Sequence, residues 1–352
     1  VMVMRLRRHL LREALSISIT LILLMAAATV LCASCAAQAA SENITIIDSA
    51  GREVEIPYPA NKVVLLTADN CELAVVLDAR DKVVGVEKSA PGYAEIGEMF
   101  GKAANAGGSQ EPDFEKIADL NPDVVLGYKS SLENGVADEL KGMGIPFVVC
   151  ECNRIQTFEK DVELMGRILG KEDNAKEFLA FHNSIMDLIA ERTRSISSDQ
   201  RTSLYLTGGG TTFGKDGGIE PYLSAVGAKS IGSELPGESS VTVDPEWVLD
   251  QDPQVIVHWI TSSKIKPTPE PLIEVKESYS NDPVLNMTTA VKDGRVHVIG
   301  WCLFKGLRFS IGLLYWAKWC HPELFQDIDP EEYNREYVKK FLGIDLENVW
   351  AQ

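Results

Sequence analysis

The sequence predicts an α/β protein of two lobes, each built on its own parallel sheet and joined to the other by a helical segment. Predicted strands alternate with helices along the chain, and this order favours parallel sheets with crossover helices. A long helical stretch divides the alternating pattern, and one helix–strand pattern occurs in each half. At 352 residues the chain is long enough for two domains.

The repeated pattern occupies residues 113–126 and 244–257. Each copy begins with an aspartate that can cap a helix and has a glutamate two positions later, Glu115 or Glu246. A short helix, a proline and an apolar strand follow. The distance between the copies excludes a solenoid, whose units recur every ~20–50 residues. We expect two similar lobes with the ligand cleft between them.

Residues 1–41 are predicted to be a signal or membrane-anchor segment. Basic residues between positions 5 and 12 precede an uncharged run over 14–41 that is apolar at its centre and ends in small residues. The run is long enough to span a bilayer uncleaved, and Cys35 is a candidate for lipid attachment. Each outcome exports the rest of the chain to the outer face of the cytoplasmic membrane, in the periplasm or outside the cell, with its N-terminus anchored or cleaved.

The first lobe is predicted over residues 42–156. Segments 44–48 and 53–57 form a hairpin in this prediction, because a glycine turn separates them. A strand at 62–66 leads into a loop that contains Asp69 and Asn70. We further expect strands at 83–86 and 146–150, helices at 71–77 and 136–141, and the first copy of the repeated pattern.

Residues 157–199 are predicted to connect the lobes. Apolar residues recur at helical spacing from Phe158 to Leu169, Gly170 interrupts the pattern, and a long helix continues beyond it. This stretch lies between the two copies of the repeat, so it is expected to join the lobes. His182 falls on its apolar face, and we interpret it as a core residue.

The second lobe is predicted over residues 200–352. We expect strands at 203–206 and 296–299, helices at 221–226, 311–319 and 333–342, the second copy of the repeat, and a proline-rich loop at 261–271. Gly209, Gly214 and Lys215 have the spacing of a phosphate-binding loop, but Asp216 stands where Ser or Thr should bind magnesium. We interpret the segment as a glycine loop at the edge of a cleft.

Charge and motif content argue against several functions. The net charge of −17 argues against nucleic acid as a partner, which needs a basic face. Neither a catalytic signature nor a convergent set of metal ligands is present, so we expect no enzyme activity, no bare metal site and no intrinsic cofactor. An exported enzyme or a cofactor scaffold on the same lobes remains an alternative. A monomer is expected.

The cysteines do not form a recognisable framework. The exported part of the chain contains an odd number of them, Cys71, Cys150, Cys152, Cys302 and Cys320. Their spacing does not match a zinc site or a Cys-x-x-Cys motif. We expect mostly buried free thiols, although export would permit disulfides.

Aromatic and basic residues follow three predicted strands. They are Tyr128 and Lys129, then Trp259, then Trp301, Lys305 and Arg308. Ligands of open parallel sheets bind at the carboxyl ends of the strands. Aromatic faces together with Lys and Arg suit a flat or anionic ligand.

Several short motifs match a known family. They lie in segments 47–57, 62–64, 72–86, 114–125, 290–296 and 317–325. With these motifs the chain resembles the substrate-binding components of ABC importers for ferric siderophores, haem and corrinoids, over roughly residues 44–343. The resemblance implies two lobes joined by one rigid helix, with a ligand cleft that closes modestly.

The resemblance also implies roles for individual residues. Glu115 and Glu246 match the glutamates that engage arginines of the permease. The cleft-lining loops match Asp69 and Asn70, the region of Tyr93, and the strand-end residues given above. The chain departs from the family in its poor lipid-attachment box and in the cysteines near the cleft.

We therefore expect a receptor that captures a small metal chelate and delivers it to an ABC permease with its ATPase subunits. A ferric siderophore is the first choice, because Lys305 and Arg308 could meet anionic chelate oxygens. A corrinoid is the second, because Tyr128, Trp259 and Trp301 could pack on a macrocycle, and haem is a further alternative of the same class.

Overall fold

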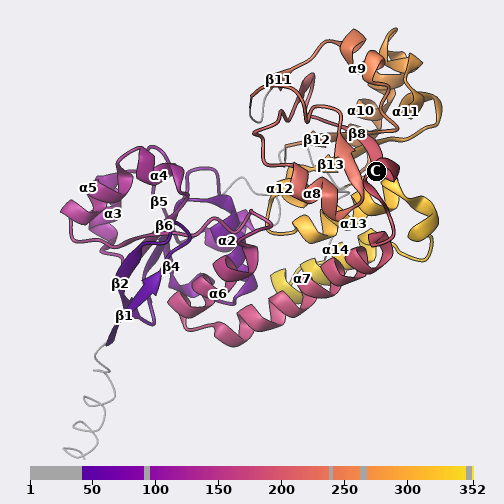
Figure 1. Cartoon of the computed structure of the whole chain (residues 1–352). Helices are drawn as coiled ribbons and strands as arrows, with labels where there is room; N and C mark the ends of the chain where they lie inside the picture. The colour runs from indigo at the N-terminus through magenta and orange to yellow at the C-terminus, as the bar shows by residue number, and fades with distance from the viewer. Residues whose placement is uncertain (1–41, 91–95, 238–240, 262–267, 346–350) are drawn as a thin grey trace, which may run out of the picture. The chain divides into compact units, whose positions relative to one another are not determined.

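Two separate sheets, one from each half of the chain, form the framework of the protein (Figure 1). The computed structural model describes residues 42–90, 96–237, 241–261, 268–345 and 351–352. The α/β class with parallel sheets is confirmed. The lobe boundaries at residues 42, 157 and 200 stay predictions.

The first sheet has five parallel strands in the order β5-β4-β3-β6-β7. Its strands are β3 Val63–Leu65, β4 Val83–Val86, β5 Ala104–Asn105, β6 Val124–Gly127 and β7 Phe147–Val149. The predicted hairpin is present as a separate two-stranded sheet of β1 Glu42–Ile47 and β2 Glu53–Tyr58. Every residue of β3, β6 and β7 is buried, as expected for strands covered on both faces.

The helices of the first half largely follow the prediction, with one correction. They are α2 Ala68–Val76, α3 Phe114–Leu120, α4 Ser130–Glu133, α5 Val136–Gly142 and α6 Phe158–Leu169. Helix α2 begins before residue 71, because the Thr67 side chain accepts a hydrogen bond from the backbone N–H of Asn70 at 3.2 Å and caps the helix. Asp69 and Asn70 therefore lie in the first helical turn and not in a loop.

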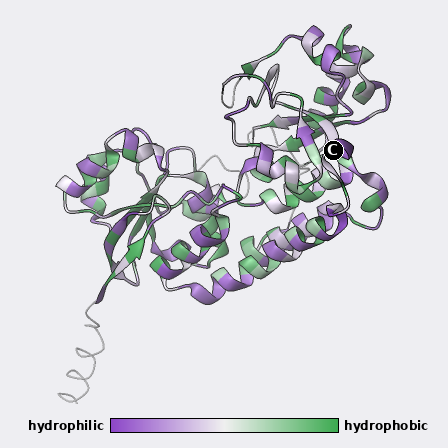
Figure 2. Cartoon of the chain, in the orientation of Figure 1, coloured by the Kyte–Doolittle hydropathy of each residue, from purple (hydrophilic) through white to green (hydrophobic). Residues whose placement is uncertain are grey.

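The connecting segment consists of α6 followed by α7, Glu172–Thr193. Gly170 ends α6 in the left-handed region at a φ of 64°, which glycine adopts without strain. Apolar and polar residues alternate around α7, as Figure 2 shows. His182 is confirmed as a core residue, since it packs on Phe158 and Phe309 with ring centroids 4.4 and 5.1 Å apart. Burial lowers the pKa of His182 to about 3.

The second sheet has six strands, with the path β11-β9-β8-β12-β13 and β10 paired with β8. They are β8 Thr202–Thr207, β9 Thr211–Thr212, β10 Ala228–Ser230, β11 Val241–Thr242, β12 Val255–Ile260 and β13 Val296–Gly300. Strands β9 and β11 are antiparallel additions to an otherwise parallel sheet. The glycine segment after β8 turns directly into β9, whereas a phosphate-binding loop would open a helix there.

The second half contains more helix than the sequence pattern predicts. Its helices are α8 Glu220–Ala225, α9 Pro245–Gln251, α10 Glu270–Asn281, α11 Thr289–Lys292, α12 Trp301–Lys305, α13 Phe309–Cys320 and α14 Pro330–Tyr337. A π-helical turn, η8 Val338–Leu342, follows α14. Helix α10 begins within the stretch expected to be a proline-rich loop, with Pro271 in its first turn, where the missing N–H is tolerated.

The two copies of the repeat adopt the same local structure. Helices α3 and α9 each have seven residues and end in a left-handed residue, Asn121 at a φ of 46° and Asp252 at a φ of 41°. A proline then starts the connection to β6 or β12, and each of these strands lies beside the central strand of its sheet. The repeat therefore places Glu115 and Glu246 at equivalent positions in the two lobes.

Four of the described cysteines, Cys71, Cys150, Cys152 and Cys320, are buried free thiols, as predicted. Cys302 is half-buried. The sulfur atoms of Cys150 and Cys152 are 3.3 Å apart. Burial raises the pKa values of Cys152 and Cys320, so these thiols stay protonated at neutral pH.

Candidate functional site

A pocket of about 460 Å³ opens at the carboxyl ends of β3, β4 and β6 in the first lobe. This is the end of a parallel sheet where ligands bind. Polar groups dominate its lining, which consists of Leu66, Thr67, Ala68, Glu87, Lys88, Ser89, Gly108, Ser109, Gln110, Glu111 and Tyr128.

Tyr128 connects this pocket to a buried carboxylate. Its hydroxyl donates to Asp69 Oδ2 at 2.6 Å, and the Asn153 side chain donates to the same oxygen at 3.0 Å. Burial raises the pKa of Asp69 to about 7, although these two hydrogen bonds oppose the shift. Asp69 therefore orients Tyr128 at the pocket and titrates near neutral pH.

Asn70 is predicted to contact the ligand, but its side chain is buried inside the protein. It is fully buried, and within the described part of the chain its side-chain amide has no hydrogen-bond partner. A buried polar group without a partner costs about 1–3 kcal/mol. In this conformation Asn70 is an interior residue of α2.

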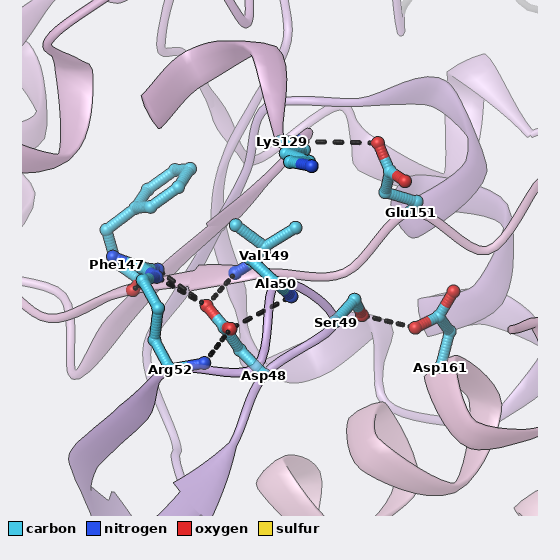
Figure 3. A network of polar contacts seen from close by, with 9 residues as sticks. All are labelled: Asp48, Ser49, Ala50, Arg52, Lys129, Phe147, Val149, Glu151 and Asp161. Carbon is cyan, nitrogen blue, oxygen red and sulfur yellow. Dashed lines mark hydrogen bonds and ion pairs between the residues drawn. The ribbon is translucent and has the colours of Figure 1, made fainter. Parts of the chain in front are cut away.

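Lys129 is exposed beside the pocket, immediately before α4. Its backbone N–H lies 3.4 Å from Glu151 Oε1 (Figure 3). Glu151 also pairs with Arg154, whose Nε lies 2.5 Å from Glu151 Oε2. The charges after β6 and β7 thus lie close together.

A second polar network holds the hairpin against this end of the sheet (Figure 3). Asp48 accepts hydrogen bonds from Arg52 Nη2 at 2.6 Å and from the Val149 N–H at 3.1 Å, and Ser49 donates to Asp161. The sequence motif around Asp48 and Arg52 therefore has a structural role. It fixes β7, from which the segment with Glu151 and Arg154 leads.

The second lobe contributes an aromatic cluster at the ends of β12 and β13. The Trp259 and Trp301 rings meet edge to face at 4.8 Å between centroids, and Trp301 meets Phe304 at 5.1 Å. Both tryptophans are half-buried. Gly208 lies directly against the Trp259 ring, where a Cβ would overlap it. The structure thus brings Trp259 and Trp301, two of the predicted ligand contacts, into one cluster.

Lys305 ends α12 next to this cluster. Its Nζ lies 5.4 Å from the centroid of the Phe213 ring. Burial lowers the pKa of Lys305, and the positive charge of Arg154 lowers it further. A half-buried cation with a second cation nearby is suited to an anion.

Arg308 does not occupy the position that the sequence predicts. Its side chain is 3% exposed, and Arg308 Nε lies 2.7 Å from Glu72 Oε1, which also accepts from the Tyr337 hydroxyl at 2.8 Å. The guanidinium also stacks on the Tyr337 ring at 5.1 Å. The prediction of a direct ligand contact neglected Glu72, which is far away in the sequence and already uses this charge.

Glu115 and Glu246 are exposed in the first turns of α3 and α9. Exposure at these positions is compatible both with docking and with stabilisation of the helix dipole. Tyr93 and Cys35 lie outside the described residues.

Sequence reasoning missed the pocket residues Glu87, Lys88, Ser89 and Gln110. It also missed Arg154, whose charge acts on Lys305. The signal was available, since strand 83–86 ends just before Glu87 and strand 146–150 just before Arg154. Neither of these two strands is followed directly by an aromatic residue.

The residues that the structure describes contain no group of three or more His, Cys, Asp or Glu side chains arranged to hold a metal ion. None of the helices that these residues form has the length and apolar character needed to cross a membrane.

Three curated relatives match most of the chain. The uncharacterized ABC transporter substrate-binding lipoprotein YvrC of Bacillus subtilis is 27% identical over 81% of this chain and 87% of its own length. The molybdate-binding protein MolA of Haemophilus influenzae is 22% identical over 84% and 90%. The petrobactin-binding protein YclQ of Bacillus subtilis is 25% identical over 72% and 80%.

Solved structures support the fold. The TroA-like periplasmic binding protein FepB from Veillonella parvula superimposes with a TM-score of 0.77 at 20% identity, covering 88% of this chain and 99% of that one. MolA bound to molybdate gives a TM-score of 0.71 at 20% identity, covering 87% and 100%. The family model described as periplasmic binding protein matches residues 63–300. The chain therefore belongs to the periplasmic binding protein family and is a substrate-binding protein of the ABC-transporter class.

Proposed function

We propose that this protein captures a ferric siderophore outside the cell and delivers it to an ABC permease. The observation that carries the proposal is Lys305, a half-buried cation close to a second cation, Arg154, and to an aromatic cluster. A chelate with anionic oxygens and a flat organic periphery suits this combination.

The pKa of Lys305 supports an anionic ligand. Burial and the Arg154 charge lower this pKa below its ordinary value, so the surrounding protein disfavours the charged ammonium. An anion bound beside Lys305 would favour the charged form and raise the pKa again. Anion binding and protonation of Lys305 therefore reinforce each other.

The polar pocket of the first lobe supplies complementary contacts. Lys88 adds a cation, and Ser89, Gln110 and Tyr128 add hydrogen-bonding groups at the strand ends. Lys88 replaces Arg308 as a candidate anion contact, because Arg308 is paired with Glu72. Related chains are named for petrobactin and for molybdate, so this family accommodates ligands of different size.

Fluorescence titration tests the ligand. Purified protein should lose tryptophan emission on addition of one class in a panel of ferric hydroxamate, ferric catecholate, ferric citrate, haemin, cyanocobalamin and molybdate. Lys305→Ala should weaken binding of the ferric chelate at least tenfold, and Lys229→Ala, at the exposed position of β10, serves as the control. Unchanged affinity in Lys305→Ala would contradict the charge argument.

A corrinoid is the second candidate, and the aromatic cluster favours it. Trp259, Trp301 and Phe304 offer apolar area for a macrocycle. Under this alternative Trp301→Leu abolishes cyanocobalamin binding, whereas Lys305→Ala changes it less than twofold.

We further propose that Glu115 and Glu246 dock the exported protein on its permease, whose ATPase subunits hydrolyse ATP on the other side of the membrane. Both side chains are exposed at equivalent positions of the repeat. Combined Glu115→Arg and Glu246→Arg should abolish uptake of the radiolabelled chelate and leave its affinity for the purified protein unchanged. A loss of affinity would instead assign the two glutamates to the ligand site.

A further inference from the structure

Three neighbouring strand ends of the first sheet converge on the carboxylate of Asp69. Asp69 lies in the first turn of α2 after β3, Tyr128 follows β6, and Asn153 follows β7. The Tyr128 hydroxyl and the Asn153 side chain both donate to Asp69 Oδ2, at 2.6 and 3.0 Å. Tyr128 lines the pocket of about 460 Å³, whereas Asp69 is buried and does not line it. A ligand in this pocket would therefore meet Tyr128 and not Asp69 directly.

The hydroxyl of Tyr128 has one proton and can donate it to one partner at a time. Burial raises the pKa of Tyr128 well above its ordinary value, and the charge of Asp69 raises it further, so the phenol keeps its proton. While Asp69 is ionised, this proton is directed at Oδ2, and the phenol oxygen can only accept hydrogen bonds from the pocket. An anionic ligand needs a donor. The ionised form of Asp69 therefore withholds the donor that an anion requires.

Protonation of Asp69 reverses this arrangement. A protonated carboxyl can donate to the Tyr128 oxygen and leaves the phenol proton free for the pocket. Burial raises the pKa of Asp69 to about 7, so a modest further influence decides between its two forms near neutral pH. A bound anion is such an influence, because a nearby negative charge favours the neutral carboxyl. Anion binding and protonation then strengthen each other by the same factor.

The groups around Asp69 do not offer a competing switch. The set comprises Glu72 on α2 with its partner Arg308, Glu87 and Lys88 after β4, Tyr128 and Lys129 after β6, Cys150, Cys152 and Arg154 after β7, and Tyr222 on α8. The charges of Glu72 and Glu87 raise the pKa of Asp69 and so favour its protonation. Burial raises the pKa of Cys152 well above its ordinary value and that of Tyr222 to about 12, so both stay neutral at pH 7.

We propose that Asp69 takes up a proton when the pocket binds an anionic ligand, and that the Tyr128 hydroxyl then donates to the ligand. The proton comes from the solvent and resides on Oδ2, which donates to Tyr128 and still accepts from Asn153. Asp69 acts through Tyr128 and is a positioning residue that makes the pocket more selective for anions as the pH falls. The inference rests on the proposed function, because it requires an anionic ligand.

Isothermal titration calorimetry counts the protons, because the heat of binding depends on the ionisation enthalpy of the buffer when protons are exchanged. The purified protein is titrated with a ferric tris-catecholate, ferric citrate and molybdate, in PIPES and in Tris. The probe that binds should take up about half a proton per ligand at pH 7.5. Its affinity should be about fivefold to tenfold higher at pH 6 than at pH 8.5.

Three variants assign the proton. Asp69→Asn removes the titrating group and keeps a side-chain oxygen, so the pH dependence of affinity should fall below about twofold and the uptake should disappear. This variant also corrects for titration of the ligand itself. Glu133→Gln, which removes an exposed carboxylate of α4, is the matched control and should keep the wild-type uptake. Tyr128→Phe should weaken binding at least threefold at pH 6 and less than twofold at pH 8.5. Thermal unfolding verifies that the variants are folded.

The outcomes separate this inference from the proposed function. If none of the anionic probes binds the wild type, the proposed function fails and the inference falls with it. Binding without proton exchange overturns the inference alone. Uptake that persists in folded Asp69→Asn also overturns it and assigns the proton to another group, such as Lys305. If Asp69→Asn does not fold, Tyr128→Phe decides, since equal weakening at both pH values contradicts a proton-dependent donor.

Discussion

The two lobes present different chemistry at the carboxyl ends of their strands. The first lobe offers a polar pocket whose groups are already engaged, with Tyr128 bonded to Asp69. The second offers the aromatic surfaces of Trp259 and Trp301 with the cation Lys305. Preorganised polar groups fix the orientation of a ligand, whereas aromatic area supplies non-directional binding energy. Under the proposed function, the first lobe would orient the ligand and the second would supply most of the affinity.

The largest expected effect concerns the ion pair that joins these halves. Glu72 of α2 holds Arg308 and Tyr337 from the far end of the chain. Glu72→Ala leaves Arg308 buried without its carboxylate, so it should lower the free energy of unfolding by about 3–5 kcal/mol. Chemical denaturation measures this loss. Tyr337→Phe, which removes one hydrogen bond, should cost only ~1 kcal/mol, and equal losses in both variants would contradict a charge effect.

The next effect is a pH dependence of stability that arises in the first lobe. The pKa of Asp69 is raised from 3.8 to about 7 in the folded protein, so folding favours the protonated carboxyl. The contribution of Asp69 to the free energy of unfolding is therefore largest below pH 4. This contribution is lost as the pH rises toward 7, at about 1.4 kcal/mol per pKa unit. Asp69→Asn mimics the protonated form.

Urea denaturation between pH 4 and pH 8 measures this difference. The free energy of unfolding should be higher for the variant than for the wild type. This difference should grow with pH up to pH 7 and stay constant above it. A difference independent of pH would show that Asp69 has an ordinary pKa.

The aromatic lobe should be sensitive to a single methyl group. Gly208→Ala places a Cβ where the Trp259 ring lies, so the ring must move. Overpacking of this kind costs about 1–3 kcal/mol, and the ligand affinity should fall with it. Tryptophan emission and calorimetric binding measure the two effects. Gly142→Ala, in open space on α5, should change neither.

The smallest expected effect is a difference in helix capping between the two copies of the repeat. The Asp113 side chain accepts the Lys116 N–H at 2.9 Å and caps α3, whereas Asp244 makes no such bond to α9. Asp113→Ala should therefore lower the free energy of unfolding by ~1 kcal/mol and Asp244→Ala by less than about 0.5 kcal/mol. Equal losses measured by urea denaturation would indicate that both caps act through charge alone.

Much of the fold could be predicted because its signals are local. The repeat, the amphipathic connector and the buried strands are periodic patterns, and the structure confirms α3, α7 and α9. Helix α10 was missed because prolines at positions 267, 269 and 271 suggested a loop, although Pro271 lies in the first helical turn. Strands β9 and β11 have two residues each, too few for a periodic signal.

The site was harder to predict because it depends on distant pairs. The sequence identified Tyr128, Trp259, Trp301 and Lys305 at strand ends, because the rule that ligands bind at the carboxyl ends of parallel strands needs only the order of the elements. It could not reveal that Glu72 binds Arg308, because 236 positions separate them. The same rule applies to the strand before Glu87. Lys88 was missed there because no aromatic residue follows that strand directly.

Under the proposed function, helix α2 limits how this protein can acquire new ligands. Thr67 and Ala68 at its start line the first pocket, Asp69 supports Tyr128, and Glu72 one turn later connects to the second lobe. A substitution in α2 that reshapes the pocket also changes the contact between the lobes. Divergence toward other substrates is therefore least costly in the loops after β4 and β5, around Lys88 and Gln110, where pocket residues have no part in the Glu72–Arg308–Tyr337 contact.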